Sequence, residues 1–100
     1  MISPISRRRS PMQIVADILT VANGGARITQ IVYKANLNFQ RAAKYLEMLV
    51  ERGFIKASKE PGSTRIIYWT TEKGKQFLMQ YRQMKEMLAS SMSPEDLESL

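Results

Sequence analysis

The side chains best suited to chemistry lie on one predicted helix, which ends near Gly53. One face of this helix carries Gln40, Arg41, Lys44, Tyr45 and Arg52. Basic and amide side chains can bind phosphates and hydrogen-bond to base edges. A short helix with such a face fits the major groove of double-stranded DNA. The alternative is an ordinary solvated face on a core helix.

Residues for catalysis or metal binding are scarce. The chain has no cysteine and no histidine, so a zinc site and thiolate chemistry are not expected and the commonest general base is missing. The acidic residues are scattered, and neither of the common phosphate-binding glycine motifs occurs. We therefore predict no enzyme activity, no catalytic residue, no metal and no cofactor. The sequence also shows no small-molecule substrate site.

Charge is distributed unevenly along the chain. Residues 1–85 hold all 15 basic residues and five acidic ones, a net charge of +10, whereas residues 86–100 hold four acidic residues and no basic one. A basic body favours a polyanionic partner, although a basic surface can also bind nothing specific. No apolar run is long enough to cross a membrane. We therefore expect a cytoplasmic, nucleoid-associated protein.

Apolar periodicity predicts the elements that hold this face in place. Helices are expected over about 11–23 and 28–35, and a third begins after Asn38, whose side chain should cap it. The inward stripe of the third helix is predicted to be Phe39, Ala42, Ala43, Leu46, Leu49 and Val50. Lys34 falls on the outer side of the second helix and could reach a phosphate.

Two strands, 54–58 and 65–70, are predicted around a turn at Pro61-Gly62. Proline presets φ and glycine accepts a positive φ, which suits a type II turn. The order helix, turn, helix, hairpin is that of a winged helix-turn-helix domain over residues 11–70. Lys59 and Arg65 flank the turn, so the wing could contact the DNA backbone, or the turn could simply be solvated.

A long last helix is predicted over 71–92. Phe77, Tyr81, Met84 and Leu88 follow heptad spacing along it. At about 1.5 Å per residue this helix is roughly 30 Å long, too long for a compact winged domain to bury. We predict that this seam joins two copies of the chain in a homodimer. The alternative is that the whole stripe packs back on its own domain.

The two ends of the chain are assigned by composition alone. Residues 1–10 are predicted to be a flexible basic arm, with Arg7–Arg9 either resting on phosphates or solvated. Residues 93–100 are predicted to be an acidic tail, in which Ser93-Pro94 starts a helix too short to be stable alone.

Two segments carry a resemblance to a known family. YKANLN at 33–38 and TEKG at 71–74, within a similarity that covers about residues 12–88, resemble an archaeal winged-helix family, that of the Sulfolobus ten-a chromatin protein. The resemblance implies a DNA-binding dimer joined by an antiparallel coiled coil, with a winged domain at each end. Thr70 departs from the family, which tends to have an apolar residue there.

The prediction is thus a mainly α-helical chain with a small β-hairpin, a winged helix-turn-helix followed by a coiled-coil-like helix. It should bind double-stranded DNA as a dimer, in archaeal chromatin organisation or in transcription regulation. The predicted DNA-binding residues are Lys34, Asn38, Gln40, Arg41, Lys44, Tyr45, Lys59 and Arg65. The alternative function is a protein-docking module in a larger assembly.

Overall fold

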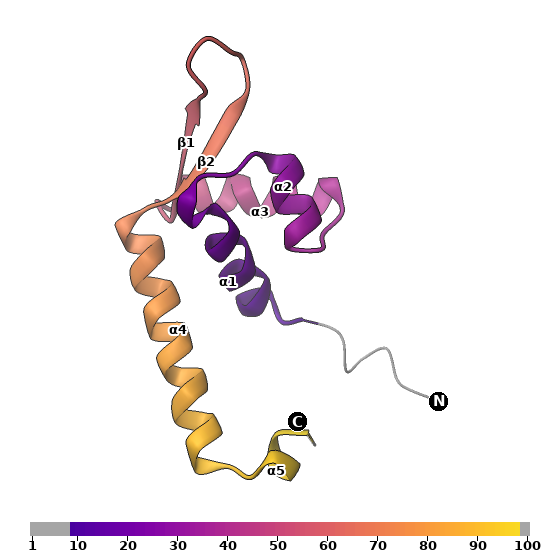
Figure 1. Cartoon of the computed structure of the whole chain (residues 1–100), viewed down its shortest axis with the longest axis vertical. Helices are drawn as coiled ribbons and strands as arrows, with labels where there is room; N and C mark the ends of the chain where they lie inside the picture. The colour runs from indigo at the N-terminus through magenta and orange to yellow at the C-terminus, as the bar shows by residue number, and fades with distance from the viewer. Residues whose placement is uncertain (1–8, 99–100) are drawn as a thin grey trace.

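A computed structural model describes residues 9–98 of the chain. The elements in order are α1 (Pro11–Val21), a 3-10 turn η2 (Ala22–Gly24), α2 (Ile28–Lys34), α3 (Phe39–Glu51), β1 (Ile55–Lys59), β2 (Ile66–Thr70), α4 (Glu72–Ser91) and α5 (Pro94–Glu98). Figure 1 shows α1, α2 and α3 gathered in one body, with the hairpin rising from it and α4 running away from it. The predicted fold class is confirmed.

The helix starts are fixed by the side chains expected to cap them. Ser10 Oγ accepts a hydrogen bond from the Gln13 amide at 3.1 Å, and Asn38 Oδ1 accepts one from the Arg41 amide at 2.8 Å. Thr71 Oγ1 accepts from the Gly74 amide at 3.2 Å. Each bond satisfies a backbone donor that has no partner inside its own helix, so each start is determined locally.

One apolar core lies among α1, α2, α3, β1 and the first turns of α4. Its largest fully buried side chains are Ile18, Leu19, Ile31, Leu46, Leu49 and Ile55. Two residues of the predicted inward stripe are not in it, because Phe39 is 58% exposed and Val50 is 36% exposed. They lie in the first and last turns of α3, where each lines an open hollow beside the hairpin instead of the core.

The β1–β2 hairpin is antiparallel, and its register pairs Ile55 with Thr70. Its tip is the predicted turn: the Ser63 amide donates to the Glu60 carbonyl oxygen at 3.1 Å, and Gly62 has φ of +71°. A third segment joins the sheet edge, because Ala26 exchanges two backbone hydrogen bonds with Tyr68. The wing is therefore bonded to the segment that leads into α2.

The TEKG segment connects the end of α3 to the start of α4. The Thr71 hydroxyl donates to the Gly53 carbonyl oxygen at 2.6 Å, and Lys73 Nζ donates to the Arg52 carbonyl oxygen at 2.8 Å. The Lys73 ammonium also lies 4.6 Å from the centre of the Phe54 ring. A cation bound to the last carbonyls of a helix is stabilised by the helix dipole. These side chains thus fasten the two helices together.

Thr70, the departure from the family pattern, is buried and bonded. Its hydroxyl donates to the Leu19 carbonyl oxygen at 2.7 Å, which links β2 to α1. A buried hydroxyl with such a partner is satisfied, whereas an unpaired one would be costly.

The α4 helix contacts the domain as far as Arg82, whose guanidinium donates to Thr20 Oγ1 at 3.4 Å. Phe77 stacks on Tyr81 with ring centres 6.1 Å apart, and both pack against the core. Beyond them residues 82–91 are exposed, including Met84 at 55% and Leu88 at 48%. The chain then turns into α5, where Ser93 and Asp96 each accept a hydrogen bond from the other's backbone amide. The segment expected to be too short for a stable helix therefore forms a capped turn of helix here.

Candidate nucleic-acid interface

The turn between α2 and α3 explains most of the YKANLN segment. Ala35 and Leu37 are buried, while Asn36 between them has φ of +55°, a left-handed conformation that asparagine tolerates better than most residues. Asn38 caps α3. The segment therefore serves mainly to fix the angle at which α3 leaves α2. Tyr33 and Lys34, which precede it, are exposed.

Arg9 holds this turn from the other side. Its guanidinium donates to Asp17 Oδ2 at 2.7 Å, to the Ala35 carbonyl oxygen at 2.6 Å and to the Asn36 carbonyl oxygen at 2.9 Å. The two carbonyl groups lie at the end of α2, where helical partners are missing. Arg9 is thus a structural residue, which corrects its assignment to a flexible arm. Residues 1–8, including Arg7 and Arg8, lie outside the described residues.

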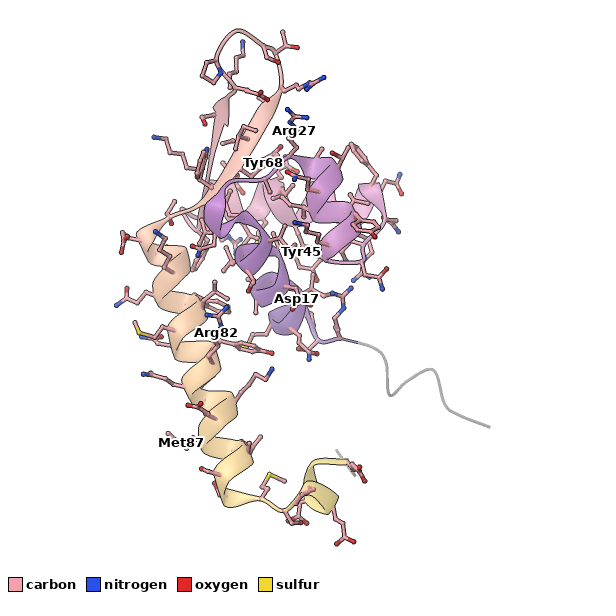
Figure 2. All side chains as sticks on the ribbon, viewed as in Figure 1. Asp17, Arg27, Tyr45, Tyr68, Arg82 and Met87 are labelled. Atoms are coloured by element: carbon pink, nitrogen blue, oxygen red, sulfur yellow. The ribbon has the colours of Figure 1, made fainter. Side chains whose placement is uncertain are left out.

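The exposed face of α3 is narrower than the sequence predicted. Gln40, Arg41 and Lys44 are exposed. The Asn38 side chain is occupied as a cap, and Tyr45 is partly buried and packs against the core. Tyr45 lies three residues after Ala42 and four before Leu49, both buried, so it shares their side of the helix. Figure 2 shows Tyr45 within the helical body.

Charge changes sign along α3. Arg41 and Lys44 lie in its first half, whereas Glu47 and Glu51, both exposed, lie in its second half. Within α3 the outer face is therefore basic in its first half and acidic in its second half, and the exposed Arg52 follows directly after the helix. A polyanion would be attracted to the first half and repelled by the second.

The wing carries the other predicted cations. Lys59 ends β1 and Arg65 directly precedes β2, and both are exposed. Lys56, which sequence reasoning missed, is exposed and pairs with Trp69 in the ladder. Its signal was the alternation of the strand, because Ile55 is buried and the next side chain must face away.

Arg27 was also missed, and it forms an ion pair with Glu60 at 3.0 Å. This bond joins the residue before α2 to the end of the wing, and Figure 2 shows Arg27 above Tyr68 at the wing. The two residues are separated by 33 positions, so no local pattern indicated the contact.

A hollow of about 510 Å³ lies between the wing and the starts of α2 and α3. Its lining is Arg27, Ile28, Thr29, Phe39, Arg65, Ile66 and Tyr68. A second hollow, of about 400 Å³, lies between α3 and the wing and shares Ile28 and Tyr68 with the first. The structure thus brings the wing residue Arg65 and the first turn of α3 to the walls of one recess.

The family model described as a winged helix-turn-helix matches residues 8–89. The chain belongs to this family. Among solved structures, Sso10a-2, a DNA-binding protein from Sulfolobus solfataricus, is 35% identical, with a TM-score of 0.70 over 83% of this chain and 88% of that one. The uncharacterized protein MJ0287 of Methanocaldococcus jannaschii is 32% identical over 83% of this chain and 80% of its own length.

A more distant solved structure shows a likeness of fold alone. BpsR of Bordetella bronchiseptica is 15% identical, with a TM-score of 0.67 over 89% of this chain and 71% of that one. The predicted resemblance to archaeal winged-helix proteins is confirmed, and the winged helix-turn-helix family identifies a non-enzymatic protein. Within residues 9–98, no helix is long and apolar enough to cross a membrane.

Proposed function

We propose that this chain binds double-stranded DNA, with the first half of α3 in the major groove. The observation that carries the proposal is the exposed cluster of Gln40, Arg41 and Lys44 at the basic end of α3. Glu47 and Glu51 at the other end would repel phosphates, so the helix should enter with its N-terminal end first. This is the end with which recognition helices contact base edges.

The wing and α2 supply the backbone contacts of this proposal. Lys59 and Arg65 lie on the wing, and Lys34 ends α2, all with exposed side chains. Such cations neutralise phosphates without reading the sequence. The similarity to the DNA-binding protein Sso10a-2, at 35% identity, supports DNA binding in general, and the residue roles are our proposal.

The test is binding to duplex DNA as the salt concentration rises. If several phosphates are neutralised, log K should fall with log salt at about −0.9 per phosphate contacted. A second test is the double variant Glu47→Gln with Glu51→Gln. It should bind duplex DNA more tightly than the parent, because the repulsion between these carboxylates and the phosphates is removed. Absence of duplex binding at low salt would refute the proposal and favour the protein-docking alternative.

We further propose that α4 joins two copies of the chain. Its 20 residues run well past the domain, and Met84, Met87 and Leu88 remain exposed on it. Phe77 and Tyr81 already pack against their own core, so the surface available to a partner begins near Met84. Clustered exposed apolar side chains favour association. Methionine-rich surfaces adapt readily to a partner.

The role we propose is nucleoid-associated, in chromatin organisation or transcription regulation. A dimer with a winged domain at each end could bridge or span DNA. Selection of bound DNA from a random pool separates the two roles. An enriched motif would support a gene-specific regulator, and a flat result would support a packaging protein.

A further inference from the structure

The Phe39 side chain lies outside the apolar core, and it has no role in the proposed contacts with the DNA backbone. It is the first residue of α3, and its side chain is 58% exposed. A single exposed apolar residue is common on protein surfaces. This one, however, lies beside Gln40 and Arg41 in the turn that the proposed function directs toward base edges.

The recess beside Phe39 combines an apolar lining with a cation. Ile28, Ile66 and Tyr68 line it, and Arg65 stands on its wall at the base of the wing tip. The other guanidinium there, Arg27, is paired with Glu60. Within the described part of the chain, Arg65 has no acidic partner, so its charge is available to an anion.

An apolar surface beside an available cation matches one edge of a thymine nucleotide. The C5 methyl of thymine is the apolar group that a base presents in the major groove, and phenylalanine is among the side chains that contact it. The phosphate of the same strand supplies the anion. We propose that Phe39 contacts thymine methyl groups and gives the domain a preference for thymine at the base it faces. This inference rests on the proposed DNA binding.

The test replaces thymine by deoxyuridine, which removes the methyl group and leaves base pairing intact. Parent protein is titrated with a short A·T duplex and with its deoxyuridine counterpart at one salt concentration. Burying one methyl should favour the thymine duplex roughly fourfold. The variant Phe39→Ala should bind both duplexes equally, and Phe39→Leu should keep part of the preference. Because Phe39 is exposed, these variants should fold, which circular dichroism checks.

A matched control is Tyr33→Ala, an exposed aromatic residue of α2 that does not line the recess. It should keep the preference of the parent for thymine. Equal binding of both duplexes by the parent, or a preference that survives in Phe39→Ala, would overturn the inference while leaving DNA binding intact. Failure of every duplex to bind would instead overturn the proposed function, and this inference with it.

Discussion

Replacing Gly74 by alanine places one methyl group where α4 crosses the end of the hairpin. A Cβ there would lie 2.6 Å from Thr70 Cγ2 and 3.3 Å from Leu19 Cδ2, and closer still to the Phe54 carbonyl oxygen. That oxygen cannot move easily, because it accepts the Thr71 amide at 3.0 Å. Overpacking of this kind costs about 1–3 kcal/mol. The closest clash is with a backbone atom, so the upper part of that range applies. Alanine normally stabilises a helix by about 1 kcal/mol relative to glycine, which leaves an expected net loss of about 1–2 kcal/mol.

The assay is urea unfolding at a fixed protein concentration, because association would shift the apparent stability. Gly24→Ala is the matched control, since a Cβ at Gly24 meets nothing within 4 Å. Its stability should stay within about 0.5 kcal/mol of the parent. A Gly74→Ala protein as stable as the control would refute the view that TEKG needs glycine for close packing.

The remaining predictions concern binding and assembly. Arg41→Ala should cost about 1–3 kcal/mol of DNA affinity and relax the preference at one base, whereas Lys59→Ala should weaken binding to all duplexes alike. If both variants bind as the parent does in a mobility-shift titration, the proposed orientation of α3 is wrong. Met84→Glu with Leu88→Glu should give a folded monomer by light scattering, and a parent that is already monomeric at tens of micromolar removes the proposed dimer. Arg9→Ala leaves two carbonyl groups of the turn without their donor, so it should lower the unfolding midpoint and weaken DNA binding more than Arg9→Lys does.

Features that depend on neighbouring residues could be predicted from the sequence. Ser10, Asn38 and Thr71 each cap the helix that begins one residue later, and Pro61-Gly62 forms the wing turn as expected. These are local because a cap or a turn involves only three or four consecutive residues.

Features that depend on contacts between elements distant in the sequence could not be predicted. Helical periodicity gives a direction around α3, but not how wide the buried sector is or where it opens into a hollow, so it predicts Phe39 inside and Tyr45 outside, the reverse of what the structure shows. Arg9 bonds to carbonyl groups 26 and 27 residues away, a distance at which no spacing rule applies. The positions of the DNA-contacting side chains on the duplex and the dimer contact remain predictions for the same reason.

The fastening of α3 to α4 has a mechanical consequence for the proposed dimer. Thr71 and Lys73 bind the carbonyl groups of Gly53 and Arg52, just after α3, so α3 and α4 are held to each other at this junction. In the proposed dimer, the separation and relative rotation of the two α3 helices would then depend on the length of α4. Each residue added to that helix would advance the distal domain by about 1.5 Å and rotate it by roughly 100°. The length of α4 would therefore determine which face of the DNA double helix the second domain can reach.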